Sequence, residues 1–273
     1  MNIISGVFKF YLNASIHVAI AVCALVGVTA LEFALAIPLN LWFFVFFGTI
    51  TGYNFVKYAE VAGVRHRTLR DSLKSIQLFS MVSFCGMLFF GVQLATMTLF
   101  VIGIFGLLTY FYATPLLKHK NLRTLGGLKV FIVAFVWAGV TVIVPLIEAN
   151  LSLETDHWVT FVQRYLIVIV LTLPFEIRDL QYDISNLKTL PQILGVKKVK
   201  FLGVSLLLIV LFLDGFKDEF TYAYFINLAI ICILIGMLLL VSKIRQPKYF
   251  ASFWVESLSI IWVLLLLLGS QLF

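Results

Sequence analysis

The sequence predicts an all-α fold: a polytopic integral membrane bundle of about nine transmembrane helices. Three observations carry this prediction: 62% of the 273 residues are hydrophobic, 12% are charged, and the mean hydropathy is +1.07. Such a composition lies far outside that of soluble proteins. The longest polar stretches are short loops, so we expect a single transmembrane domain spanning residues 1–273.

Nine apolar runs are long enough to cross a hydrocarbon core, which takes about 20 residues of helix. The first run is too long for a signal peptide and has no basic region ahead of a short core, so we interpret it as one retained helix. The seventh has Lys197, Lys198 and Lys200 at its start, and their amines must reach the membrane interface. The runs cover residues 10–30, 33–56, 75–95, 96–117, 128–147, 158–177, 196–213, 220–242 and 250–272.

The basic residues predict the topology, because short cytoplasmic loops are enriched in Lys and Arg. All 20 except Arg164 and Lys217 fall on one side if the amino terminus is inside. We therefore predict a multi-pass protein of the bacterial inner membrane, with a cytoplasmic amino terminus and the carboxyl terminus outside. A nucleic-acid partner is not expected, because the charge of +7 is divided among alternate loops and forms no continuous basic face.

An acidic motif follows the sixth apolar run. Glu176, Asp179 and Asp183 are spaced by three and four residues, so they lie on one face if the helix continues. Magnesium is commonly held by one or two carboxylates together with substrate phosphates. Carboxylates at this spacing repel each other, which favours a bound ligand. The motif predicts a Mg²⁺ site and a phosphorylated lipid substrate; the alternative is a solvated loop with Arg178 as counter-ion.

The chain resembles the intramembrane prenyltransferases of the UbiA superfamily over nearly its whole length. The matching features are the nine spans, Asn54 at the end of the second, YATPLLK at residues 112–118 after the fourth, and IRDLQYD with TLPQILG after the sixth. The resemblance implies that Asp179 and Asp183 are catalytic residues. It also implies that these two, with Glu176, bind magnesium and the diphosphate of an isoprenoid donor.

The first acidic motif of the family is degenerate in this sequence. The family pattern is Asn, then Asp four residues on, then Asp four further on, whereas this chain has Asn54, Tyr58 and Ala62. Glu60 cannot replace the missing carboxylates, because it lies two residues from each position and so on another helical face. A site with two magnesium ions is therefore not expected.

The chemistry implied by the resemblance needs cations around a leaving diphosphate and a site that excludes water. We expect phosphate contacts from cations on the inside face and from Asn54. Two alternatives remain: topology alone accounts for basic residues in inside loops, and Asn54 could cross-link helices. Tyrosines such as Tyr53, Tyr58, Tyr112 and Tyr182 could lie near a carbocation. The predicted diphosphate-binding residues are Asn54, Lys57, Arg67, Lys118 and Arg178.

Two functions follow as hypotheses. The first is a magnesium-assisted transfer of a prenyl or polyprenyl group from its diphosphate to an acceptor, aromatic or otherwise, by a protein surrounded by membrane lipids. The second is a non-catalytic relative that binds an isoprenoid or a lipid headgroup, which Tyr58 and Ala62 favour. A transporter would show helices broken near the bilayer midplane in both halves. Pro38 and Pro145 do not form such a pattern.

Two ionisable residues lie inside predicted spans, where charge is expensive and usually paired. Arg164 is near the outside end of its span, and Glu256 is near the inside end of the last one. A direct contact between them is not expected. We assign neither a catalytic role from sequence.

Overall fold

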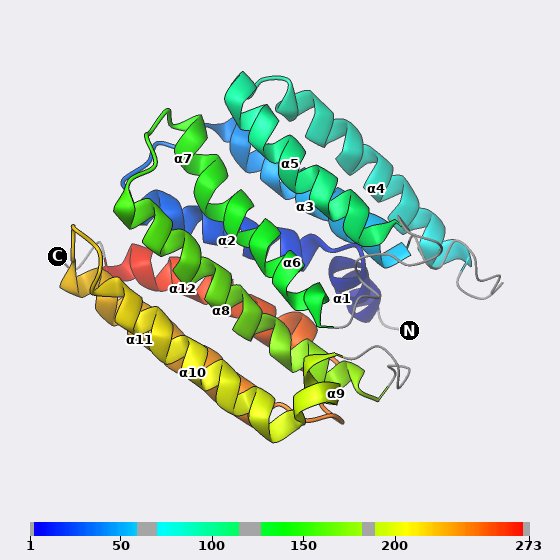
Figure 1. Ribbon diagram of the computed structural model, residues 1–273. Helices are drawn as coiled ribbons and strands as arrows, with labels where there is room; N and C mark the ends of the chain where they lie inside the picture. The colour runs from blue at the N-terminus through cyan, green and yellow to red at the C-terminus, as the bar shows by residue number, and fades with distance from the viewer. Residues whose placement is uncertain (1–2, 59–69, 115–126, 182–188, 270–273) are drawn as a thin grey trace.

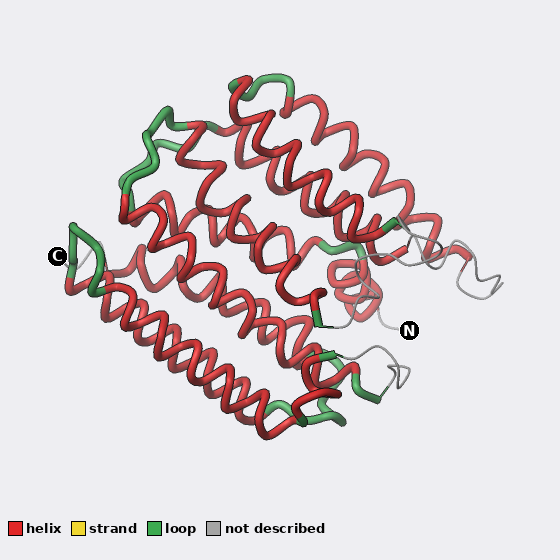
Figure 2. The backbone as a smooth tube through the Cα atoms, in the orientation of Figure 1, coloured by secondary structure: helices red, strands yellow, loops and turns green. Residues whose placement is uncertain are grey.

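The predicted all-α membrane bundle is confirmed. The computed structural model describes residues 3–58, 70–114, 127–181 and 189–269, which form long helices packed side by side and joined at the two ends of the bundle (Figures 1 and 2). The elements are α1 (Ile3–Asn13), α2 (Ile16–Glu32), α3 (Leu39–Tyr58), α4 (Arg70–Gly91), α5 (Thr96–Ala113), α6 (Leu128–Ala138), the π-helix η4 (Gly139–Ile143), α7 (Val144–Glu148), α8 (Thr155–Asp179), α9 (Leu190–Leu194), α10 (Val196–Asp214), α11 (Tyr222–Val241), the π-helix η5 (Phe250–Val255) and α12 (Glu256–Gly269).

Every predicted span corresponds to helix in the described residues. Seven helical segments are individually long and apolar enough to cross a membrane, and α1 with α2 forms a bent eighth. The remaining prediction, at 196–213, coincides with α10. One of its lysines reaches polar groups: Lys200 Nζ donates to the carbonyl oxygens of Leu240 and Ser242 at 2.6 and 2.7 Å. Lys200 thereby satisfies carbonyls at the end of α11 that have no partner within the helix.

The first predicted span is helical, but it contains a bend that the sequence does not predict. α1 and α2 meet at an angle of 57°, and Ser15 between them has a left-handed conformation with φ of 62°. Asn54 of α3 holds this break. Its Oδ1 accepts a hydrogen bond from Ser15 Oγ at 2.8 Å, and its Nδ2 donates to the Ala14 carbonyl at 3.2 Å. Polar side chains from a neighbouring helix can replace helical hydrogen bonds in this way, and none of these contacts is visible in hydropathy.

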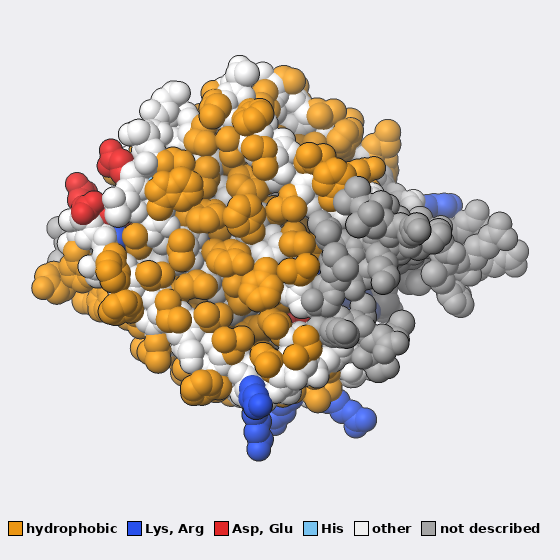
Figure 3. Space-filling view, in the orientation of Figure 1, with side chains coloured by type: hydrophobic (Ala, Val, Ile, Leu, Met, Phe, Trp, Pro, Cys, Tyr) orange, Lys and Arg blue, Asp and Glu red, His pale blue; other side chains and the backbone are white. Residues whose placement is uncertain are grey.

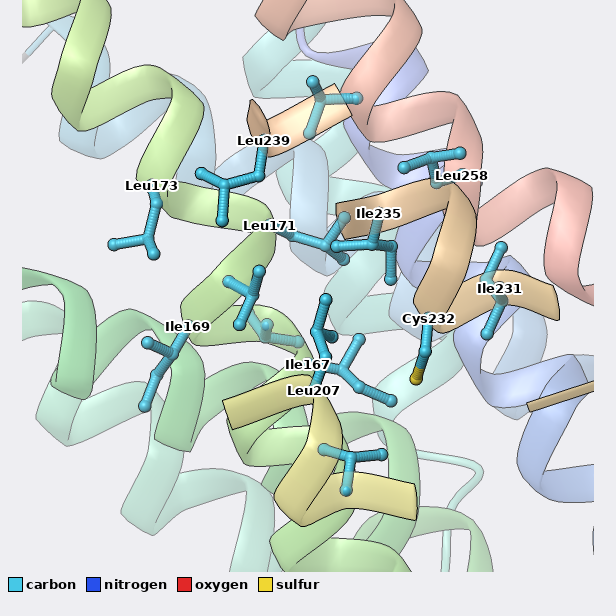
Figure 4. Close-up of a cluster of buried hydrophobic side chains, with 14 of the residues drawn as sticks. Ile167, Ile169, Leu171, Leu173, Leu207, Ile231, Cys232, Ile235, Leu239 and Leu258 are labelled. Carbon is cyan, nitrogen blue, oxygen red and sulfur yellow. The ribbon is translucent and has the colours of Figure 1, made fainter. Parts of the chain in front are cut away.

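The main apolar core surrounds α8. Buried Leu, Ile and Val side chains of α8 interdigitate with those of α10, α11 and α12 (Figure 4). A second cluster joins α2, α3 and α5. Between them, Gly139 permits close packing, because the ring of Phe105 fills the space that a Cβ would occupy at this position. The core therefore fixes α8 centrally, and α8 carries the acidic motif at its carboxyl end.

The two ends of the bundle differ in charge. Hydrophobic side chains cover the side shown in Figure 3, with acidic groups at one end and Lys and Arg groups at the other. We call these the acidic end, where α8 begins, and the basic end, where α3, α5 and α8 finish. Large apolar side chains such as Leu88, Phe100 and Phe212 are exposed on the bundle surface. A soluble protein would not display so many of them together. This surface fits a lipid environment.

A buried polar network lies at the acidic end. Glu32 Oε1 pairs with Lys217 Nζ at 2.7 Å and accepts from Thr160 Oγ1 at 2.7 Å, while its Oε2 accepts from Tyr224 at 2.8 Å. Lys217 also pairs with Asp214 at 2.8 Å. The side chains of Glu32, Lys217 and Asp214 are 7%, 5% and 2% exposed, so each charge depends on its partners. We call this set, with Gln163, the acidic-end network.

Arg164 lies next to this network and is not paired with Glu256. It is 1% exposed, and its guanidinium donates to the Leu25 carbonyl at 2.7 Å and to Thr141 Oγ1 at 3.3 Å. It also lies 5.0 Å from the centre of the Trp262 ring. These contacts explain how α8 keeps a cation inside the membrane, and they make Arg164 a cross-link between helices.

Candidate reaction site at the basic end

The carboxyl end of α8 carries the acidic motif. α8 continues through Asp179, so Glu176 and Asp179 have the helical spacing that the sequence predicts. Glu176 is 3% exposed, and its Oε1 pairs with Lys129 Nζ of α6 at 2.7 Å. Asp179 is about one quarter exposed and pairs with Arg178 through Nε and Oδ1 at 2.8 Å. Asp183, the third predicted ligand, lies outside the described residues.

The two described carboxylates therefore have different environments. Glu176 is almost fully buried and has its Oε1 paired with Lys129. Asp179 has one oxygen on Arg178 and a second directed to no described partner. A carboxylate with a spare oxygen fits magnesium held jointly with substrate phosphates. Within the described ranges, no group of three or more His, Cys, Asp or Glu side chains is arranged to hold a metal.

The end of α3 is occupied by contacts with α1. Lys57 Nζ lies 3.3 and 3.5 Å from the Asn13 and Leu12 carbonyl oxygens, and Tyr58 donates its hydroxyl to the Asn13 carbonyl at 3.1 Å. Together with Asn54 at the Ala14 carbonyl, these side chains cap the carboxyl end of α1. Asn54 also donates to Ser80 of α4 at 2.8 Å. The degenerate first motif therefore has a structural use, and the cross-linking alternative for Asn54 matches its observed contacts.

Aromatic groups lie near the same end. Tyr53 accepts a hydrogen bond from Trp137 Nε1 at 2.9 Å, and Tyr112 is 5% exposed. Tyr53 and Tyr112 are close enough to interact electrostatically. The Arg178 guanidinium lies 5.2 Å from the centre of the Phe175 ring. The predicted phosphate ligands Arg67 and Lys118 and the tyrosine Tyr182 lie outside the described residues.

Glu256 belongs to this region, and the sequence reasoning gave it no role. It is half-buried at the start of α12 and interacts electrostatically with Lys57 of α3 and Arg178 of α8. Lys129 was likewise treated only as a topology signal, although it neutralises Glu176. The available sequence signal for Glu256 was its position as an acidic residue inside an apolar span on the inside face. That signal gives no information on which helices surround it.

An open groove elsewhere does not contribute to this site. It lies at the acidic end, has a volume of about 780 Å³ and is lined in part by Trp158, Val162 and Leu213. It is far along the bundle from Asp179 and Lys57, since α8 runs from one end to the other. The charged groups of the basic end, rather than this groove, carry the chemical argument.

Comparison with solved structures identifies the architecture. A UbiA homologue from Archaeoglobus fulgidus bound to GPP and Mg²⁺ superposes with a TM-score of 0.62 at 11% identity, covering 96% of this chain and 99% of that one. A UbiA homologue from Aeropyrum pernix K1 gives 0.64 at 14% identity, covering 94% and 97%. The chain has a UbiA fold. A digeranylgeranylglyceryl phosphate synthase gives 0.59 at 19% identity, covering 97% of this chain and 99% of that one.

Sequence comparison gives a different result. No protein-family model matches the chain, and no curated protein matches it by sequence. The UbiA fold is thus evident from the arrangement of helices over the whole chain. At identities below one fifth, the roles of individual residues rest on the contacts described above.

Proposed function

We propose that this protein is a member of the UbiA superfamily that transfers a prenyl or polyprenyl group from its diphosphate to an acceptor in the membrane. The observation that carries the proposal is the position of Lys57 and Arg178 near Asp179 of the α8 acidic motif, at one end of a UbiA fold. Structures of the Archaeoglobus fulgidus homologue bound to GPP or DMAPP with Mg²⁺ support this class of donor.

The chain's own groups have separate parts in the proposed reaction. Arg178 and Lys57, with Arg67 and Lys118 from the neighbouring loops, bind the phosphate oxygens and stabilise the charge that develops as the diphosphate leaves. Tyr53 and Tyr112 face the carbon that becomes cationic. The apolar helices hold the prenyl tail and exclude water while the cation exists. Asp179 and Asp183 would hold magnesium, and the ion would supply charge neutralisation for the leaving diphosphate.

The degenerate first motif limits the rate in this proposal. Tyr58 and Ala62 provide no carboxylates, and Tyr58 is bonded to α1. The α8 motif then holds one magnesium ion. Loss of a metal ion withdraws several kcal/mol of charge stabilisation. Because each 1.36 kcal/mol is a factor of ten in rate, we expect slow turnover.

The test uses the full-length protein in lipid nanodiscs. Geranyl diphosphate and dimethylallyl diphosphate are titrated with and without Mg²⁺, and released diphosphate is measured over hours. Magnesium-dependent binding followed by slow release supports the proposal. Absence of binding for both donors, and for a longer prenyl diphosphate, refutes it.

A second function has one observation in its favour. Lys57 and Tyr58 contact α1, and Glu176 is paired with Lys129, so several motif positions already have protein partners. A non-catalytic relative that binds an isoprenoid or lipid headgroup would show the same arrangement. In the nanodisc experiment this function predicts donor binding with no diphosphate release at any magnesium concentration.

The location of the basic end completes the proposal. We propose that it faces the cytoplasm of a bacterial cell, because short cytoplasmic loops are enriched in Lys and Arg. Water-soluble Mg²⁺ and diphosphate would then enter and leave on that side. The chain would function as a single transmembrane domain across residues 1–273.

A further inference from the structure

Glu256 lies at the basic end, directly after an irregular stretch of helix. It is the first residue of α12 and directly follows the π-helix η5. A π-helical turn inserts a residue and re-aims the side chains that follow, and such turns are frequent at functional sites. Without this turn, the residue at position 256 would face another direction.

The backbone before Glu256 is held in place. His17 of α2 bonds the Phe253 carbonyl through Nε2 at 3.1 Å and meets the Tyr11 hydroxyl through Nδ1 at 2.7 Å. Ser257 donates to the same carbonyl at 2.7 Å. The π-helix is thereby tied to α1 and α2, so Glu256 keeps a fixed position relative to the end of α3.

The surroundings of Glu256 combine cations and phenols. Lys57 and Arg178 attract its carboxylate, and Tyr11 and Tyr53 lie within electrostatic range. Yet neither cation forms an ion pair with it: Lys57 bonds α1 carbonyls and Arg178 bonds Asp179. Within the described residues, Glu256 has no hydrogen bond or ion pair. A carboxylate inside a membrane protein without a direct partner is costly. The Glu256 carboxylate is therefore suited to bind a cation that enters the site together with a ligand.

We infer that Glu256 supplies a carboxylate ligand, from the last helix, to the magnesium ion of a bound magnesium–prenyl diphosphate. It thus adds a carboxylate from α12 to the one ion that the α8 motif holds, while positions 58 and 62 still provide none. The inference rests on the proposed function and deepens it. Magnesium is commonly held by protein carboxylates together with the phosphates of a substrate. Lys57 and Arg178 flank Glu256 and bind the phosphate oxygens of the same complex.

The competing reading makes Glu256 only a counter-ion of Lys57 and Arg178. The two readings predict opposite effects for the neutral, equally sized Glu256→Gln. A metal ligand favours the anionic donor only when Mg²⁺ is present, so its loss weakens binding in magnesium. A counter-ion repels the donor under all conditions, so its loss strengthens binding with or without magnesium.

The experiment titrates geranyl diphosphate into wild type, Glu256→Gln and Glu256→Asp in nanodiscs, with Mg²⁺ and with chelator. We expect Glu256→Gln to weaken binding at least tenfold in Mg²⁺ and not in chelator, and Glu256→Asp to recover part of the loss. With Mn²⁺ in place of Mg²⁺, the electron paramagnetic resonance signal of the bound ion should change in Glu256→Gln. Glu219→Gln, an exposed change at the acidic end, is the matched control.

Each outcome decides between the readings. Equal affinity of wild type and Glu256→Gln in Mg²⁺, or tighter binding in both conditions, overturns the inference and leaves the proposed function standing. If wild type binds no prenyl diphosphate, the proposed function fails and the inference fails with it. If Glu256→Gln does not fold, Glu256→Asp decides by its own magnesium dependence: binding unchanged from wild type overturns the inference.

Discussion

The acidic and basic ends both bring charged side chains into the membrane bundle, but they satisfy them differently. At the acidic end, Glu32 and Asp214 share Lys217, and Thr160 and Tyr224 supply further hydrogen bonds. At the basic end, Glu256 has no direct partner in the described residues and Asp179 has one. Fully paired charged side chains hold the helices together, whereas incompletely paired ones are available to a ligand. Burial of charge alone therefore does not mark a site, whereas incomplete pairing of a charge does.

Removing the cation of the acidic-end network should have the largest effect on stability. Lys217→Met leaves Glu32 and Asp214 buried without their shared partner. Breaking a buried pair in this way costs about 3–5 kcal/mol. Thermal unfolding in detergent should show a large fall in midpoint, while the exposed Lys243→Met leaves it unchanged. An unchanged midpoint for Lys217→Met would mean that the network does not hold the helices together.

Substitution in the acidic motif should have the largest effect on binding. Asp179→Ala or Asp183→Ala should weaken magnesium-dependent binding of geranyl diphosphate about a hundredfold or more, equivalent to roughly 2.7 kcal/mol. Thermal stability should hardly change, because Asp179 is partly exposed. Isothermal titration in nanodiscs measures the affinity, with Asp156→Ala at the acidic end as control. Wild-type affinity in both variants would refute the magnesium site.

Loss of one α1 cap should have a smaller, structural effect. Tyr58→Phe removes only the hydroxyl that bonds the Asn13 carbonyl, which is worth about 1 kcal/mol. We expect faster hydrogen exchange in α1 and unchanged donor affinity. Tyr110→Phe, on the exposed surface of α5, serves as the comparison. A drop in donor affinity with α1 exchange unaltered would instead place Tyr58 in the binding site.

Cysteine labelling should show which end of the bundle faces the outside of the cell, without disturbing either end. With Cys23, Cys85 and Cys232 replaced, Asp218→Cys should react with an impermeant maleimide in intact cells, and Lys243→Cys only after lysis. The charge asymmetry of the loops is the reason. The opposite pattern would invert the orientation. Neither exposed substitution should alter stability by more than about 0.5 kcal/mol.

The sequence predicts the long helices well, because each needs only a run of apolar residues. It also places Glu176 and Asp179 at the end of the correct helix. It fails where the structure depends on contacts between distant residues. The break at Ser15 requires Asn54, 39 positions away. Glu176 meets Lys129 only because α6 packs on α8, and the place of Glu256 depends on a π-helical turn.

The cap on α1 has an evolutionary consequence. A chain without the first metal site could acquire it by Tyr58→Asp with Ala62→Asp, but the Asn13 carbonyl would then lose one of its two hydrogen-bond donors and face a new negative charge. The two changes would be harmful unless α1 had first moved or shortened. The same double substitution should therefore raise diphosphate release more in a background where α1 no longer relies on Tyr58. Acquisition of the motif and the position of the amino-terminal helix are epistatic: the order in which mutations occur decides whether the path is open.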